Sequence, residues 1–211
     1  MKNFIRIIAG SVLLFWSTAQ AEIQFGVGVL AGQVETSGTE TEGTAADTSD
    51  RSKTIKESFV GADLFIEYIS DGGYTLGVNY VPMDVELGNG SRTDVSGDGS
   101  ENDAGTRKAA ADITDLITVY ANVPVGSNGW YGLLGYHTTT VTTTETLNES
   151  SYGNTDIDGY QIGIGKRAGS VKMELAYSDF DDITLNSSTG ATGQKITADV
   201  DAIQAKIGFN F

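Results

Sequence analysis

The sequence predicts an all-β protein, a closed eight-stranded antiparallel up-and-down β-barrel that crosses a membrane. Three observations predict this fold. Apolar side chains recur at every second residue in eight short segments, the connections between these segments alternate between short and long, and aromatic residues gather at the ends of the apolar stripes. A period of two places alternate side chains on the same face of a strand, so each segment is expected to have one apolar face.

The first twenty-one residues differ from the rest of the chain. Lys2 and Arg6 precede an apolar run over residues 7–16, and the small residues Ala19 and Ala21 follow it. This is the layout of a secretory signal peptide, and the run is too short and wrongly flanked for a transmembrane helix. We expect cleavage after Ala21 and a mature barrel of residues 22–211. A buried N-terminal helix is the alternative.

Composition excludes several classes of function. The chain has no cysteine and one histidine, so thiol catalysis, cysteine-bound zinc and multi-histidine metal sites are excluded. It has 28 acidic against 13 basic residues, a net charge of −15. Such a chain repels nucleic acid, which is therefore not an expected partner. We expect no cofactor and no metal site.

The apolar stripes follow one another along the mature chain. They cover residues 23–31, 60–68, 74–80, 113–123, 130–136, 160–164, 171–177 and 203–211. In the fourth stripe Asp115 interrupts the series that joins Ile113 to Ile117. The fifth is apolar on both faces, so its register stays open.

The connections are the stronger signal. Residues 70–73, 124–129 and 167–170 have the composition of tight turns. Four longer connections, about 34–55, 84–108, 138–158 and 179–199, contain 19 of the 28 acidic and 6 of the 13 basic residues. This alternation places every long connection at the same end of the sheet, and we expect four acidic surface loops there. Short turns at one end and long loops at the other are typical of an outer-membrane barrel.

The face opposite the apolar stripes carries small residues and a few charges. A narrow eight-stranded barrel is almost filled by such side chains. We expect a charge network in the lumen, formed by Asp63, Glu67, Lys172, Glu174 and Lys206. Two interpretations remain open at this point: ion pairs that plug the barrel, or charges that line a wet lumen.

Aromatic residues mark both ends of the stripes. Aromatic rings favour the level of the lipid headgroups, so two belts of rings indicate two membrane interfaces. The predicted interface aromatics are Phe25, Tyr68, Tyr74, Tyr80, Tyr160, Tyr177 and Phe209.

The chain ends in Ile207-Gly208-Phe209-Asn210-Phe211. With the signal peptide and the rhythm of strands and loops, this ending resembles the small outer-membrane barrels of Gram-negative bacteria, of the OmpA, OmpX and opacity-protein type. The resemblance implies that Ile207, Phe209 and Phe211 form the signal read by the barrel-assembly machinery. It also implies a monomer in the outer membrane, in contact with lipid and lipopolysaccharide.

One enzymatic hypothesis deserves a test on the residues. The eight-stranded lipid A deacylases, which this chain resembles in size, use a His-x-Ser pair. Here His137 is followed by Thr138 and Thr139, so threonine stands at the position of the serine, and the sequence places no acidic partner.

Four functions follow from these patterns. The leading hypothesis is a non-enzymatic envelope barrel with a structural or surface-interaction role, carried by its acidic loops. The alternative is a narrow, cation-favouring, porin-like channel for small solutes. A remote alternative is a lipid A-modifying enzyme around His137. The fourth is a secreted soluble β-barrel or sandwich.

Overall fold

The computed structural model describes residues 22–44, 47–94, 105–146, 151–188 and 194–211, which form antiparallel strands and turns. The predicted signal peptide lies outside the described residues. No described helix is long and apolar enough to cross a membrane. In chain order the strands are β1 (Glu22–Thr44), β2 (Asp47–Ile69), β3 (Thr75–Val81), β4 (Val85–Asp94), β5 (Gly105–Val125), β6 (Trp130–Thr146), β7 (Thr155–Ala168), β8 (Val171–Phe180), β9 (Ile183–Asn186) and β10 (Lys195–Asn210).

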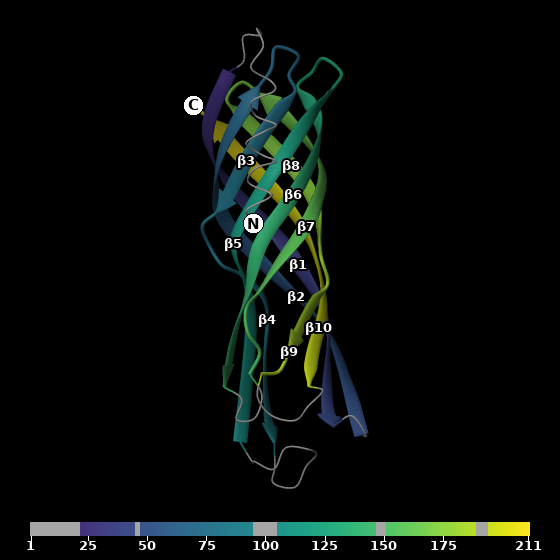
Figure 1. Cartoon of the computed structure of the whole chain (residues 1–211). Coiled ribbons are helices and arrows are strands. Elements are labelled where there is room, and N and C mark those ends of the chain that lie inside the picture. The colour runs from purple at the N-terminus through teal and green to yellow at the C-terminus, as the bar shows by residue number, and fades with distance from the viewer. Residues whose placement is uncertain (1–21, 45–46, 95–104, 147–150, 189–193) are drawn as a thin grey trace.

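These strands close into a ring (Figure 1). β3 and β4 occupy one position because both pair with β5, and β8 and β9 likewise share the edge of β10. The ring closes where β1 pairs with β10, from Gly26 opposite Asn210 to Thr41 opposite Lys195. All pairs are antiparallel, and strands that follow one another along the chain are neighbours in the ring. The prediction of a closed eight-stranded up-and-down barrel is confirmed.

The three short turns lie together at the upper end of Figure 1. In the turn between β2 and β3, the Gly73 N–H donates to the Ser70 carbonyl over 2.8 Å. Gly129, between β5 and β6, has a φ of 75°, and a Cβ there would lie 2.3 Å from the Arg167 carbonyl oxygen. Only glycine combines this backbone conformation with so close an approach of two turns.

At the other end, the strands continue into ranges that the sequence assigns to loops. β1 and β2 stay paired as far as Thr44 opposite Asp47, so range 34–55 is a hairpin and not a loop. β4 and β5, β6 and β7, and β9 and β10 similarly enter the other three ranges. The predicted loop boundaries are therefore too wide. Segments rich in threonine, serine and charged residues still form paired strands here. Hydrogen bonding between neighbouring strands satisfies the backbone N–H and C=O groups, and this does not require an apolar stripe.

We call the described residues within 34–57, 82–116, 138–158 and 179–202 the projection, and the remaining strands the membrane half. In the membrane half the apolar side chains face outward, as Val29 (57% exposed) and Ile162 (61%) illustrate. Soluble monomers rarely expose apolar surface on this scale, so the exposure favours lipid as the surrounding medium over a soluble sandwich. The lumen of this half is polar.

The projection has the opposite arrangement, with an apolar interior. Its buried core consists of Val34, Val85, Leu87, Ile113, Val141, Tyr152, Ile157, Phe180, Ile183, Leu185, Val200 and Ala202. The same strands thus present apolar side chains to lipid over one part of their length and to each other over the next.

A β-bulge in β5 causes part of this reversal. The pairing of β5 with β6 shifts between Thr114 and Ile117, and Asp115 has a φ of 53°. Ile113 is consequently buried (2% exposed) whereas Ile117 faces outward (38%). The expectation that both belong to one outward stripe is wrong, because the bulge inserts a residue and exchanges the faces. The structure also fixes the register of β6, where Trp130 and Leu134 face outward and Tyr131 and Leu133 face the lumen.

Within the described residues of the projection, β2 and β4 are not joined by backbone hydrogen bonds, and we call the gap between them the seam. β2 pairs with β3 only from Leu64 to Ile69. Beyond this point side chains fill the gap: Met83 lies against Gly61, and Ile55 lies against Gly88, where a Cβ would be 2.8 Å from its Cδ1 atom. The projection is therefore two facing sheets, with β9, β10, β1 and β2 on one side and β4, β5, β6 and the first residues of β7 on the other (Figure 1).

Candidate functional site: an ion-pair network in the lumen

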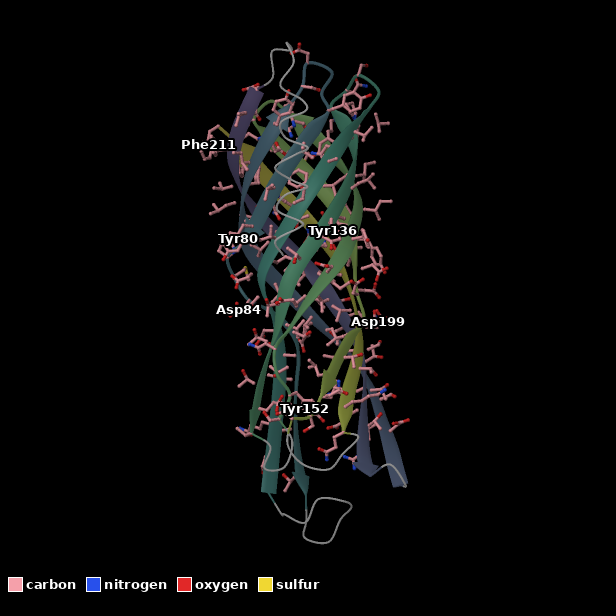
Figure 2. All side chains as sticks on the ribbon, in the orientation of Figure 1. Tyr80, Asp84, Tyr136, Tyr152, Asp199 and Phe211 are labelled. Atoms are coloured by element: carbon pink, nitrogen blue, oxygen red, sulfur yellow. The ribbon has the colours of Figure 1, made fainter. Side chains whose placement is uncertain are left out.

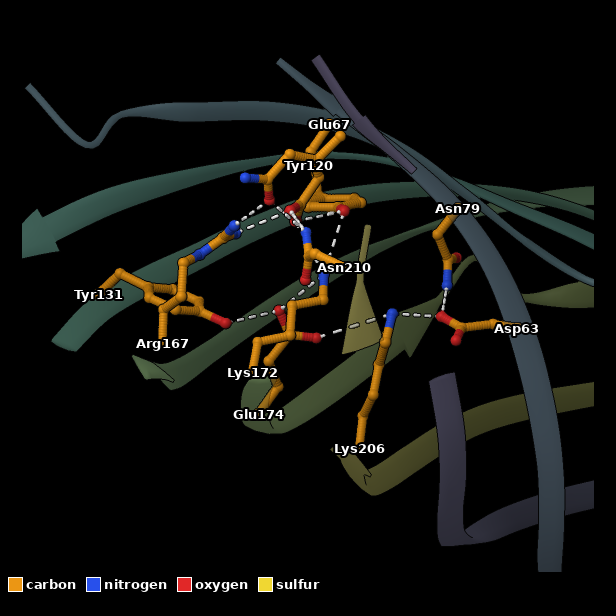
Figure 3. A network of polar contacts seen from close by, with 11 residues as sticks. Asp63, Glu67, Asn79, Tyr120, Tyr131, Arg167, Lys172, Glu174, Lys206 and Asn210 are labelled. Atoms are coloured by element: carbon orange, nitrogen blue, oxygen red, sulfur yellow. Dashed lines mark hydrogen bonds and ion pairs between the residues drawn. The ribbon is translucent and has the colours of Figure 1, made fainter. Parts of the chain in front are cut away.

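The lumen of the membrane half contains all five residues of the predicted charge network (Figure 3). Asp63 and Glu67 come from β2, Lys172 and Glu174 from β8, and Lys206 from β10. Their alternate spacing along each strand turns them to the same, inner face. Glu67 and Lys172 are completely buried, Asp63 is 1% exposed and Lys206 5%. The side chain of Glu174 is 7% exposed.

Glu67 is the centre of the network. Its Oε1 atom accepts from Lys172 Nζ at 2.8 Å and from the Tyr120 hydroxyl at 2.8 Å. Its Oε2 atom accepts from Arg167 Nη2 at 2.7 Å and from Asn210 Nδ2 at 2.9 Å. Four donors converge on one carboxylate, which is what a fully buried carboxylate needs in place of water.

A second part of the network lies around Asp63 and Glu174. Asp63 Oδ2 accepts from Lys206 and from Asn79. Glu174 lies 3.5 Å from Lys172 Nζ and 3.9 Å from Lys206 Nζ, and it also accepts from the Tyr131 hydroxyl over 2.9 Å. Glu174 therefore links the two lysines into one continuous set of contacts.

The network is electrically balanced. Three carboxylates (Asp63, Glu67, Glu174) face three cations (Arg167, Lys172, Lys206). Both lysines also lie over the Phe65 ring, with Nζ-to-centroid distances of 3.8 Å and 4.5 Å. Balanced pairing offsets the high cost of desolvating these charges, and neither sign is left in excess to attract a mobile ion.

The sequence did not identify four of the polar partners. Arg167 ends β7 beside a turn, where it reads as a solvated turn residue, yet its guanidinium reaches back to Glu67. Tyr120 lies on β5, whose apolar stripe Asp115 interrupts, and Tyr131 lies on β6, whose register the sequence left open. Asn210 lies within the C-terminal motif assigned to assembly. One signal for Arg167 is present in the sequence. The five predicted lumen residues comprise three carboxylates and two lysines, so one negative charge lacks a cation, and Arg167 supplies it.

His137 also faces the lumen, in a cage of neutral groups. Its Nδ1 atom lies 2.7 Å from Thr118 Oγ1, its Nε2 atom lies 2.9 Å from Ser178 Oγ, and its ring stacks on Phe180. The hydroxyls beside the imidazole therefore belong to Thr118 and Ser178, which the sequence did not identify. Thr139, the candidate nucleophile, donates instead to the Thr114 carbonyl at 2.6 Å.

The cavity beside His137 has a volume of about 40 Å³. This space accommodates a few water molecules and no acyl chain. Within the described residues, no group of three or more histidine, aspartate or glutamate side chains is arranged to hold a metal ion.

The predicted interface aromatics lie on the outer face at the two borders of the apolar stripes. Phe25, Tyr74 and Phe209 are 55%, 60% and 48% exposed near the short turns, where Tyr68 is half-buried. Tyr80, Tyr160 and Tyr177 (37%, 65% and 46% exposed) lie toward the projection. We call these last three, with Tyr136, the tyrosine belt; Tyr136 packs edge-on against Tyr160 with ring centroids 5.4 Å apart.

Carboxylates begin directly beyond the tyrosine belt. The Tyr80 hydroxyl donates to Asp115 at 3.2 Å, and the Tyr177 hydroxyl donates to Asp201. Figure 2 shows Tyr80 and Tyr136 at a similar level, with Asp84 and Asp199 farther from the short-turn end. The belt therefore marks the border between the apolar surface and an acidic one.

The predicted assembly residues share one face of the C-terminal segment. Ile207, Phe209 and Phe211 are 48%, 48% and 78% exposed. The backbone of Phe211 pairs with that of Phe25, so Phe211 lies at the edge where the ring closes, near the short turns (Figure 2).

A closed antiparallel ring with an apolar outer surface, an aromatic belt at each border and a charged interior is a β-barrel of the outer-membrane type.

No family model and no curated protein matches the chain. Similar solved structures include outer membrane protease OmpT from Escherichia coli, at 9% identity over 89% of this chain and 97% of that chain, with a TM-score of 0.46. Ail of Yersinia pestis, in complex with the heparin analogue sucrose octasulfate, is 11% identical over 89% and 99%, with a TM-score of 0.45. Neisserial surface protein A is 10% identical over 89% and 97%, with a TM-score of 0.43.

Proposed function

We propose that this protein is a non-enzymatic, non-conducting outer-membrane barrel that holds its projection outside the bilayer as a surface for interaction. The observation that carries this proposal is the lumen network, in which three carboxylates, three cations and two tyrosines fill the membrane half. With the lumen closed, the part of the molecule left to act on its surroundings is the projection.

The geometry favours this function over a narrow pore. A conducting eight-stranded barrel needs a continuous wet path, whereas Glu67 and Lys172 have no solvent exposure and the cavity beside the network holds about 40 Å³. An ion passing through would have to separate ion pairs that are bound to each other in a poorly hydrated space, and this separation carries a high energetic cost.

The position of His137 likewise speaks against deacylation. A lipid substrate would approach from the outer face, but the imidazole is 2% exposed and points into the lumen. Its partners are the neutral hydroxyls of Thr118 and Ser178, and no carboxylate among the described residues bonds to either ring nitrogen to orient it for general-base catalysis. The His137 cage therefore packs the lumen in this proposal.

The partners in this proposal follow from the two outer surfaces. The apolar surface contacts outer-membrane lipid, and the acidic surface beyond the tyrosine belt lies among the headgroups of lipopolysaccharide. The C-terminal face formed by Ile207, Phe209 and Phe211 is offered to the assembly machinery during insertion. The closed ring leaves no unpaired edge in the membrane half, so the barrel acts as a monomer.

Conductance in a planar bilayer tests the proposal. Folding is verified first, from the difference in gel mobility between unheated and boiled protein. We expect the native barrel to be silent, and we expect openings from Glu67→Ser/Lys172→Ser, which stays neutral but removes the central side chains. Glu35→Ser/Lys56→Ser is the matched control, because that pair (2.7 Å) is exposed on the projection, and it should remain silent. Steady cation-selective openings of the native protein would establish the channel instead.

A further inference from the structure

The projection encloses a hollow between its two sheets, with a volume of about 440 Å³. β1, β2, β9 and β10 form one wall and β4, β5 and β6 the other. Small-molecule sites in proteins typically occupy about 300–1,000 Å³, so the hollow has the size of a ligand site. Tyr152, which lines it, lies far from the short-turn end in Figure 2, well beyond the tyrosine belt.

The floor of this hollow is apolar. Leu87, Val141, Ile183 and Leu185 line it and are themselves at most 8% exposed, because they belong to the core of the projection. An open hollow with such a floor presents apolar surface to water, which is unfavourable until another apolar group covers it.

The pairing of residues across neighbouring strands shows which charged side chain borders the apolar floor. One inward row runs from Lys53 on β2 to Gly38 on β1, then to Ala198 on β10 and Ile183 on β9. Gly38 contributes no side chain, and a Cβ placed there would meet nothing closer than 3.8 Å. The row is therefore an open apolar track with one exposed ammonium group at its end.

The next row along the strands differs because its cation has a carboxylate opposite. There Arg51 lies directly opposite Glu40, and the row continues to Ile196 and Leu185. A cation and a carboxylate thus face each other across the strands in this row, whereas Lys53 has glycine opposite. Lys53 and Lys108 both line the hollow without a carboxylate directly opposite, and Lys53 is the one that lies at the end of the apolar track, where the opposite glycine leaves space for an anionic group from outside the chain.

We propose that this hollow binds a free long-chain fatty acid, with its alkyl chain along the Gly38–Ala198–Ile183 track and its carboxylate at Lys53. The net charge of the whole chain does not prevent this binding, because charges farther away than about 8 Å are largely screened at physiological salt. The inference rests on the proposed role of the projection and gives that role a ligand.

The test uses the full barrel in lipid nanodiscs and a dansyl-labelled fatty acid, with empty nanodiscs to subtract partition into the bilayer. We expect saturable binding, and displacement by unlabelled fatty acid. Gly38→Phe fills the track and should abolish binding. Lys53→Gln should weaken binding by about threefold to fivefold, the factor expected for one exposed charge contact.

Two controls make the outcome decisive. Lys56→Gln lies on the same strand but on its outer face, paired with Glu35, and should bind as the native protein does. A fatty alcohol of the same chain length should bind equally to native protein and Lys53→Gln. Binding unchanged in Gly38→Phe, or equal losses in both lysine variants, would overturn the proposal. These readouts are independent of conductance, so an open lumen would contradict the proposed function without changing the result for the hollow.

Discussion

Lys172 is the residue on which the lumen network depends most, since it contacts both Glu67 and Glu174 from a fully buried position. Lys172→Met should lower the free energy of unfolding by about 3–5 kcal/mol, because it leaves two buried carboxylates short of a cation. Urea unfolding in detergent micelles measures this loss.

The matched exposed cation provides the comparison. Lys56→Met removes a pair with Glu35 whose side chains are 55% and 43% exposed, and should cost about 1 kcal/mol or less. Equal losses for the two variants would show that the lumen is hydrated. Addition of Glu67→Gln to Lys172→Met should recover part of the loss, because the central carboxylate then no longer needs a counter-charge.

Asp112 in the projection leads to a prediction on pH. Burial raises the pKa of its carboxyl group above the ordinary value, and the nearby Glu86 and Asp84 add to this effect. Glu86 lies directly opposite Asp112 in the ladder. Because its pKa is raised by folding, Asp112 favours the folded state when protonated, and this contribution is lost as pH rises through the folded-state pKa.

Asp112→Asn should therefore stabilise the protein at pH 7, by no more than about 1 kcal/mol for a partly screened pair of like charges. Urea unfolding at pH 7 and near pH 3 tests this prediction. The gain should vanish at the lower pH, where the native carboxyl is also protonated. A gain of the same size at both values would assign the effect to something other than charge.

At the scale of single residues, the sequence predicted the inner position of five charged groups because alternation alone decides which face a residue occupies. It could not predict which of them touch. The contact between Arg167 and Glu67 joins residues 100 positions apart, and it depends on the radius of the closed ring and on how far a guanidinium reaches across it.

Among the elements, β5 is the one whose shape is most unusual. Asp115 holds a positive φ in its bulge while its carboxylate accepts from Tyr80. Asp115→Gly should change the free energy of unfolding little, because glycine relieves the backbone and offsets the lost hydrogen bond. Asp115→Val should cost about 1–3 kcal/mol, because a β-branched residue strains this conformation.

Urea unfolding of the two variants side by side measures the difference. Asp115→Asn serves as the control, since asparagine tolerates the same conformation. If Asp115→Val were as stable as Asp115→Gly, the bulge would have moved or disappeared, and Ile113 would then have turned outward.

The extents of the strands were harder to predict than their existence. Beyond Val34, β1 continues through Glu35, Thr36, Ser37 and Gly38, in which no apolar alternation is visible. Pairing with β2 and β10 on both sides makes this segment a strand, and such tertiary pairing has no local signature. The bulge in β5 was equally hidden, because Asp115 reads as an interruption of a stripe and not as an inserted residue.

For the whole molecule, the position of the bilayer along the barrel is the property to test. The chain has no cysteine, so single cysteines can be introduced without background. Val29→Cys and Leu134→Cys in the apolar surface should resist a water-soluble thiol reagent in intact vesicles. Glu35→Cys and Thr39→Cys on the projection should react. Labelling is read from the mass of the protein.

The contrast should be lost when the vesicles are dissolved in detergent and the protein is unfolded in urea, which shows that protection comes from the folded barrel and its lipid. Rapid labelling of Val29→Cys in intact vesicles would contradict the assignment of the membrane half. Slow labelling of Glu35→Cys would instead shift the border beyond the tyrosine belt.

The exchange of apolar faces between the two halves also has an evolutionary consequence. In the membrane half, outward positions need only remain apolar, while inner positions are tied to specific ion partners. In the projection the inner positions are constrained by packing, whereas the outward positions are not required for the core. Substitutions at the outward positions of the projection can therefore accumulate without loss of the barrel, so lineages of this protein should diverge first on the outward surface of the projection.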